Sequence, residues 1–228
     1  MASRFDKRIG EILKKSLLPL MRTRGFCKNG STYIALRDEV TWLVDVQKSR
    51  WNDSHEAQFT INGGVYIPGV VSGYSGRPEP AKPKLVDCCL SVRIGMLDES
   101  RLDKWWKLND ADNEEEHDEQ IAAELSARVG RQLLPFLGRF DSRKEVVAFL
   151  TTPPISAADK LVSPQDETRR HAYAAFIYAG QRNAAKAQEE IERAAQEAKG
   201  SPVENVMQKL RQRLAATLTC PWTAPDRA

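Results

Sequence analysis

The sequence predicts an α+β protein, in which a four-stranded antiparallel meander is covered by an N-terminal helix and followed by a helical C-terminal region. Three observations lead to this fold class. Apolar residues recur at helical spacing near the N-terminus, four segments between residues 32 and 96 alternate apolar and polar side chains, and the remainder again has helical periodicity. A group of strands followed by a group of helices is typical of α+β architectures.

The N-terminal helix is expected over residues 4–23. Its apolar stripe consists of large side chains at three- and four-residue spacing, namely Phe5, Ile9, Ile12, Leu13, Leu17, Leu20 and Met21. Pro19 is expected to kink or tighten the last turn, because proline lacks a backbone N–H and its ring clashes with the preceding turn. Gly25 follows as the expected C-terminal cap.

The four expected strands are Thr32–Leu36, Thr41–Lys48, 58–67 and 86–96, with a loop rich in proline and glycine at 68–84. Successive side chains of a strand point to opposite faces of the sheet. The alternation therefore predicts one apolar face, which the first helix would cover, and one polar face. Gln47, Asn62 and Arg93 fall on the polar face, together with Asp45.

Helices are expected throughout the rest of the chain. An acidic segment at 110–119 leads into a helix whose stripe is formed by Ile121, Leu125, Val129, Leu133, Leu134 and Leu137. Asp141 is the expected N-cap of a helix over 142–150, and residues 151–154 end it. Three more helices are expected at 171–178, 184–198 and 203–218.

This pattern predicts two domains, a sheet domain at 1–150 and a helical hairpin-like region at 155–220. The second region resembles one helical pair of a tetratricopeptide repeat. A repeat array needs about three such units, and the sequence contains one, so a plain helical hairpin is favoured.

Composition and charge narrow the class of protein. A hydrophobic fraction of 41% indicates a globular protein, and no run reaches the roughly 18 apolar residues of a membrane span. We therefore expect a cytoplasmic protein that does not contact the membrane. The net charge of +3 is too small to indicate nucleic-acid binding by itself, although residues 1–50 are basic and 98–124 are acidic.

Recognisable catalytic, cofactor and metal motifs are absent from the sequence. The four cysteines form no CxxC pair, so we expect free thiols at Cys27, Cys88, Cys89 and Cys220. The three histidines are far apart and are expected on the surface. The carboxylates at 110–124 have few apolar neighbours, which is typical of a hydrated helix start and not of an acid–base or metal site. No catalytic residue, metal or cofactor is predicted.

A binding surface is the functional feature that the sequence suggests. The candidate binding residues are Gln47, Lys48, Arg50, Trp51, Asn62, Arg93 and Trp106. Trp51 beside Arg50 and Lys48 can stack on a ring while the cations meet phosphate or carboxylate. In the alternative, structural interpretation, Trp51 packs under the connection and Asp45 pairs with Arg93 across the sheet.

The adjacent tryptophans Trp105 and Trp106 cannot both face the core of one regular element. One is expected to pack, and the other to lie half exposed, where it could anchor a partner.

Four segments, GFCKNGSTYIAL, VDVQKSRW, QFTINGGVYIP and CCLSVRIGML, resemble an uncharacterised bacterial family known as domain of unknown function 4304. The matching positions are Gly25, Phe26, Lys28, Gly30, Tyr33, Gln47, Lys48, Ser49, Phe59, Asn62, Gly64 and Val65. The resemblance covers roughly residues 5–140. It implies an α+β fold with an antiparallel sheet, and it implies no activity because none is established for the family.

The leading hypothesis is a non-catalytic bacterial binding protein whose partner is another protein or a small polar ligand. By analogy it could be an immunity or antitoxin protein, with Glu114, Glu115 and Glu116 as a decoy for a basic toxin surface. One alternative is nucleic-acid binding through the basic first helix and the QKSRW segment. The other is an enzyme with a cryptic site on the polar sheet face. The sequence does not indicate an oligomeric state.

Overall fold

The chain packs into two units, each assembled from separate stretches of the polypeptide. The computed structural model describes residues 4–110 and 113–219. The first unit comprises Met1–Arg37, Thr41–Gly64 and Val92–Arg139, and the second comprises Asp38–Val40, Val65–Ser91 and Phe140–Ala228. The predicted domains at 1–150 and 155–220 are single stretches, whereas these units exchange segments along the chain.

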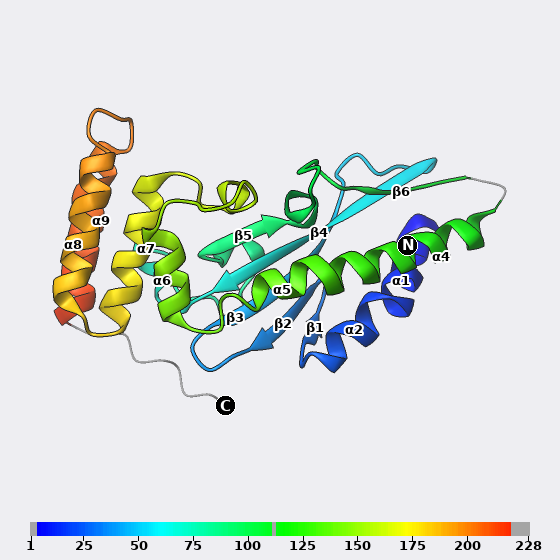
Figure 1. Cartoon of the computed structure of the whole chain (residues 1–228), viewed down its shortest axis with the longest axis horizontal. Helices are drawn as coiled ribbons and strands as arrows, with labels where there is room; N and C mark the ends of the chain where they lie inside the picture. The colour runs from blue at the N-terminus through cyan, green and yellow to red at the C-terminus, as the bar shows by residue number, and fades with distance from the viewer. Residues whose placement is uncertain (1–3, 111–112, 220–228) are drawn as a thin grey trace. The chain divides into compact units, whose positions relative to one another are not determined.

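The α+β fold class is confirmed, with an antiparallel sheet as its β component (Figure 1). The strands are β1 (Cys27–Asn29), β2 (Thr32–Leu36), β3 (Thr41–Lys48), β4 (Glu56–Tyr66), β5 (Leu90–Arg93) and β6 (Trp106–Asn109). Their spatial order is β1-β2-β3-β4-β5, as expected for a meander, and β6 pairs with β4. In the β4–β6 pair, Phe59 lies opposite Trp106 and Glu56 lies opposite Asn109.

Two strands were not predicted, and one predicted strand is shorter. β1 and β6 have only three and four residues, too few for an alternating pattern to stand out. The predicted strand at 86–96 is reduced to β5, between two 3-10 helices, η1 (Leu85–Asp87) and η2 (Ile94–Leu97). A Cβ on Gly95 would lie 2.2 Å from the carbonyl oxygen of Leu102, so the backbones approach there as only glycine allows.

The predicted N-terminal helix is divided into α1 (Arg4–Lys15) and α2 (Leu17–Thr23). Pro19 explains the division, because it cannot donate a hydrogen bond to the carbonyl of Lys15. Ser16 stands at the junction, and its hydroxyl donates to the carbonyl of Ile12 at 2.6 Å. Gly25 ends α2 with a left-handed φ of 76°, which confirms it as the cap.

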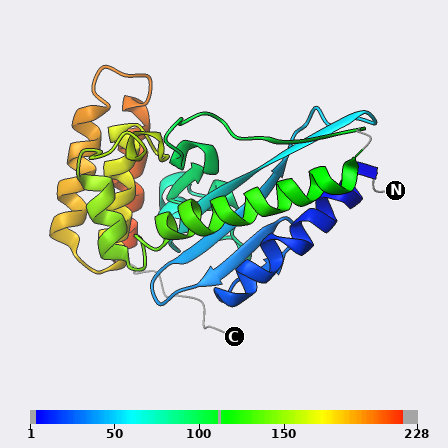
Figure 2. The ribbon, with the colours of Figure 1, turned by 45° about the vertical axis from the view of Figure 1, so that its right-hand side comes forward.

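The apolar stripe that was predicted as one helix forms α4 (Glu114–Arg128), the π-helical η3 (Val129–Leu133) and α5 (Leu134–Leu137). Pro135 lacks the N–H of a regular helix, which accounts for the widened turn before it. In Figures 1 and 2 these three segments run as one long rod across the strands of the first unit. α1 and α2 pack against α4, so the long rod shares with the N-terminal helix the role of covering the sheet.

The predicted polar face of the sheet is closed to solvent along β4. β4 is buried from Phe59 to Tyr66, and the buried residues include Asn62, which was predicted on the polar face. β4 is a central strand that is covered on both faces, so the polar or apolar character of its residues no longer indicates whether they are exposed. Four polar residues of the sheet, Asp45, Gln47, Gln58 and Arg93, are half-buried and so retain some contact with solvent.

Helices dominate the second unit, as expected. They are α3 (Val70–Ser75), α6 (Arg143–Thr151), η4 (Asp159–Leu161), α7 (Glu167–Gly180), α8 (Ala184–Glu197) and α9 (Glu204–Thr219). α3 lies within the segment 68–84, which was predicted as a loop. Alanines at the α7–α8 contact are fully buried, and Met207, Leu210 and Leu214 of α9 complete this core. The N-cap of α6 is Ser142 and not Asp141, because Ser142 and Glu145 form a reciprocal capping box.

Two buried polar groups stabilise the second unit. The guanidinium of Arg170, only 1% exposed, donates to the carbonyls of Leu150 at 3.1 Å and Thr152 at 2.8 Å, and also to that of Phe149. It thereby caps the C-terminal end of α6. His171 was expected on the surface but is largely buried. Its side chain lies between α7 and α8, where its Nδ1 is 2.6 Å from the carboxylate of Glu190.

Within the described residues, Cys27, Cys88 and Cys89 are free thiols as predicted, and Cys220 lies outside those residues. None of the described helices combines the length and the apolar character needed to cross a membrane.

Candidate functional site

The connection between β3 and β4, residues 49–55, is held in one conformation by its own polar groups. The backbone N–H of Ser49 donates to the carbonyl of Gln58 at 2.9 Å. The side-chain amide of Asn52 donates to the same carbonyl at 3.2 Å, and its oxygen accepts from the N–H of Gln58 at 2.9 Å. Asn52 thus takes the place of a neighbouring strand and extends the ladder beyond the end of β3.

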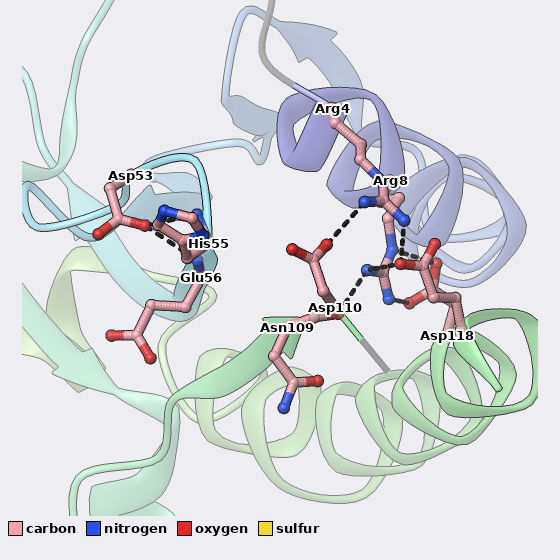
Figure 3. Close-up of polar contacts among 9 residues, drawn as sticks. Arg4, Arg8, Asp53, His55, Glu56, Asn109, Asp110 and Asp118 are labelled. Carbon is pink, nitrogen blue, oxygen red and sulfur yellow. Dashed lines mark hydrogen bonds and ion pairs between the residues drawn. The ribbon is translucent and has the colours of Figure 1, made fainter. Parts of the chain in front are cut away.

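Asp53 organises the return of this connection into β4. Its carboxylate accepts hydrogen bonds from the backbone N–H groups of His55 at 2.7 Å and Glu56 at 2.9 Å (Figure 3). These bonds from Glu56 and His55 lower the pKa of Asp53, because they stabilise its charged form. We call the whole segment 49–56 the Trp51 turn.

Trp51 is the most prominent side chain of the Trp51 turn. Its side chain is 71% exposed, and its backbone N–H donates to Ser49 Oγ at 3.1 Å. The guanidinium carbon of Arg50 lies 4.8 Å from the centre of the indole ring, which is a cation–π arrangement. The interpretation that Trp51 packs under the connection is therefore wrong. A large aromatic side chain is instead presented to solvent by a well-ordered turn.

Lys48 lies at the base of the Trp51 turn and forms an ion pair with Asp6 of α1. Its neighbour Gln47 points to the other face of β3, because strand side chains alternate. The predicted single surface from Gln47 to Trp51 is therefore split into two groups.

Gln47, Asn62 and Arg93 form the second group and do lie together, on neighbouring strands. Asn62 Nδ2 donates to Gln47 Oε1 at 3.0 Å, and Arg93 reaches the side-chain oxygens of both, each at 3.4 Å. Arg93 also forms an ion pair with Asp103, whose carboxylate accepts from Trp105 Nε1 at 2.9 Å. Because these polar groups form hydrogen bonds and ion pairs with one another, we interpret the cluster as structural.

The alternative pairing of Asp45 with Arg93 is not formed. Asp45 Oδ1 accepts from Thr32 Oγ1 at 2.8 Å and from Ser31 Oγ at 3.3 Å. Arg93 pairs with Asp103 instead. Asp103 and Trp105 were not predicted as members of the cluster, because an irregular segment positions them and periodicity carries no information there.

Trp106, predicted as a candidate anchor, is buried at 2% exposure. It lies on β6 with its ring stacked on Phe59, the ring centres 5.5 Å apart, and its Nε1 donates to Glu124 at 2.9 Å. One tryptophan of the pair was expected to pack and the other to lie half exposed, and Trp105 is indeed half-buried. Trp106 is the member that packs.

The basic face of α1 is engaged by acidic groups near the start of α4 (Figure 3). Arg4 forms ion pairs with Asp110 at 2.6 Å and with Glu114. Arg8 makes a bidentate contact with Asp118 at 2.7 and 3.1 Å. The hydrogen bond that Arg8 donates to Asp118 is the main reason that the pKa of Arg8 is raised, against the opposing effect of burial.

Among the described residues, no group of three or more His, Cys, Asp or Glu side chains is arranged to hold a metal ion. The candidate site therefore consists of the exposed pair Arg50 and Trp51 on the Trp51 turn, together with the basic helix α1 and the acidic start of α4. Tryptophan and arginine are enriched in protein–protein interfaces.

A family model described as "Domain of unknown function (DUF4304)" matches residues 17–139. This match covers more than half of the chain. The chain belongs to this family. The matched segment contains the Trp51 turn and the whole Gln47–Asn62–Arg93 cluster, and it begins after α1, later than residue 5 where the resemblance was expected to start. Neither the curated proteins nor the solved structures gave a match.

Proposed function

We propose that this protein is a non-catalytic interaction protein that binds a partner protein through the Trp51 turn. The observation that carries the proposal is the 71% exposure of Trp51 on a turn that is ordered by its own hydrogen bonds. A large exposed apolar side chain is costly in water, and interface hot spots are enriched in tryptophan and arginine. Because the turn is already ordered, binding would cost little conformational entropy.

The chemistry of the turn indicates the kind of partner. The flat indole of Trp51 would enter an apolar pocket, while Arg50 beside it would meet a carboxylate at the pocket rim. We assign the protein to the bacterial cytoplasm, since free thiols suit a reducing compartment and the family it resembled from sequence is bacterial. An immunity or antitoxin role is one way in which such a protein could act, by analogy.

Nucleic-acid binding is the alternative with a different chemistry. It would use the cations of α1 and the QKSRW segment, but Arg4, Arg8 and Lys48 are each paired with a carboxylate. Lys7 and Lys15 of α1 have no carboxylate partner among the described residues. Phosphate would have to displace the carboxylates bound to the other three cations, which favours a protein partner. An enzyme with a cryptic site would need a buried acid or base in a cleft, and no feature of the Trp51 turn supplies one.

The test is photo-crosslinking in the cell that expresses the protein. A photo-reactive amino acid at Ser54, on the exposed turn, is expected to give a discrete protein adduct. Trp51→Ala in the same chain should reduce that adduct at least about tenfold, as the loss of a hot-spot side chain worth more than 1.4 kcal/mol does. The matched control is Leu36→Ala, because Leu36 is 74% exposed on the first unit but lies outside the turn.

The proposal fails if no protein adduct forms, or if Trp51→Ala leaves the adduct unchanged. An adduct that is removed by nuclease and not by protease would support the nucleic-acid alternative instead. Equal loss in the Leu36→Ala control would indicate general destabilisation and would also count against a specific role for Trp51.

A further inference from the structure

We propose that the groove between α1 and α4 binds the same groove of a second copy of this chain, which gives a two-fold symmetric dimer held mainly by opposite charges. The groove has a volume of about 350 Å³. It is lined by Lys7, Arg8, Glu11, Ile12 and Lys15 of α1 and by Glu114, Glu115 and Asp118 of α4. Both helices belong to the first unit, so one unit contains the whole surface.

The positive charge of Arg8, at the floor of the groove, is already paired with acidic side chains of α4. The side chain of Arg8 is 11% exposed and is bound by Asp118 at 2.7 Å and by Glu114 at 3.3 Å. Ile12 is buried beside it. These internal contacts fix the two helices against each other and leave the recognition of a partner to the rims.

The two rims carry opposite charges that are not used internally. Lys7 and Lys15 line the α1 rim, and Glu115 lines the α4 rim; all three are exposed, and none forms an ion pair with any other residue of the described ranges 4–110 and 113–219. Beyond the groove the separation continues, with Glu119 exposed on α4. Glu11 also lines the α1 rim, where it pairs with Lys14 at 3.6 Å. The α1 rim therefore keeps a net positive charge from Lys7 and Lys15, and it runs beside the negative rim of α4.

The direction of the helices makes this surface complementary to itself. Arg4 pairs with Glu114 and Arg8 pairs with Asp118, so α1 and α4 run in the same direction at matched levels. A two-fold axis along the groove would place α1 of one copy opposite α4 of the other, and it would do so twice. The cationic rim of each copy would then meet the anionic rim of its partner. Each copy of the chain has both the positive and the negative rim, so a second copy is the partner that we propose for the groove.

Ion pairs at a solvated interface are screened by salt, so dimerisation should depend on ionic strength. Sedimentation velocity of the full chain should show a dimer at about 0.01 M ionic strength and a monomer at about 1 M, where the Debye length falls from about 30 Å to about 3 Å. The variants Lys7→Glu/Lys15→Glu and Glu115→Lys/Glu119→Lys should each be monomeric at low salt, because like charges then face each other. An equimolar mixture of the two variants should recover the dimer, since every facing pair is again opposite.

The matched control is Lys28→Glu/Lys107→Glu, which makes the same charge change at exposed lysines of the first unit that do not line the groove, and it should keep the dimer. Circular dichroism checks that each variant is folded. If a charge reversal prevents folding, the neutral variant Lys7→Gln/Lys15→Gln decides, with an expected loss of at least about threefold in dimer affinity.

Three results would overturn the proposal. The wild-type chain could stay monomeric at low salt up to its solubility. Alternatively, both charge-reversal variants could dimerise as well as the wild type, or the mixed variants could fail to associate although each is folded.

Discussion

Replacing Gly63 with alanine is expected to destabilise the first unit by about 1–3 kcal/mol, the usual cost of overpacking a core. A Cβ at Gly63 would lie 2.5 Å from Cδ1 and 3.3 Å from Cγ of Leu133 in η3. Leu133 is 0% exposed, so its side chain has no open space to move into. The contact holds the long helical rod against β4, and the added methyl group would push the two apart.

The assay is chemical denaturation followed by tryptophan fluorescence, which reports on this unit because four of the five tryptophans, Trp42, Trp51, Trp105 and Trp106, lie within it. The control is Gly10→Ala in α1, where no atom lies within 4 Å of an added Cβ. That substitution should stabilise the protein by about 0.5–1 kcal/mol, because alanine is the better helix former.

A double-mutant cycle tests the stated cause. Leu133→Ala alone should cost about 2–5 kcal/mol, since it leaves a cavity in the core. In its presence the methyl group of Gly63→Ala fills part of that cavity, so the double variant should be more stable than the sum by about 1 kcal/mol or more. If the two effects add within about 0.5 kcal/mol, the proposed clash is not the source of the loss.

Three more predictions concern buried or charged groups. Arg170→Ala should lower the stability of the second unit by about 3 kcal/mol or more in thermal unfolding, because it removes three charge-assisted hydrogen bonds to the carbonyls that end α6; a loss below about 1 kcal/mol would contradict this role. The hydrogen bond from Arg128 lowers the pKa of Asp98, so this carboxylate stabilises the fold above its ordinary pKa of 3.8 and the contribution is lost as the pH falls through the lower folded-state pKa. Asp98→Asn should therefore reduce the denaturation midpoint at pH 6 and flatten its fall in acid, and an unchanged pH profile would refute the assignment. Among the described cysteines, Cys27 should react with a thiol reagent in the native protein, whereas Cys89, whose pKa burial raises to about 12, should react only after unfolding, as mass spectrometry would show.

Much of the fold could be predicted because it depends on local periodicity. The bounds of β2 and β3 agree residue for residue with the alternating runs. Helices α6 to α9 were located from their apolar spacing and caps, although α7 begins earlier, at Glu167, where Asp166 accepts a hydrogen bond from the N–H of Arg169. α3 was not located, because it is a single short helix within a segment rich in proline and glycine. These features are encoded within a few residues of where they form.

The remainder depended on partners distant in sequence. β6 pairs with the start of β4, about fifty positions earlier, and its four residues alternate apolar and polar side chains over too short a run to identify a strand. The candidate site divides in the same way. The pairing of Asn62 with Gln47 follows from strand alternation, while the ion pair of Arg93 with Asp103 requires knowing the path of an irregular segment. The sequence does not decide whether Trp51 is exposed, because the residues that order its turn are equally compatible with a turn folded over the indole ring.

The segment Val65–Ser91 belongs to the second unit although it lies inside the family match at 17–139. Its helix α3 depends on residues far beyond that match: a Cβ on Gly73 would collide with Phe176 at 2.5 Å, and Arg213 donates to the carbonyl of Tyr74. A gene cut after the codon for Arg139 would keep every residue that defines the family and still strip α3 of its apolar support. A segment in the middle of the family match therefore needs the C-terminal helices in order to keep its packing.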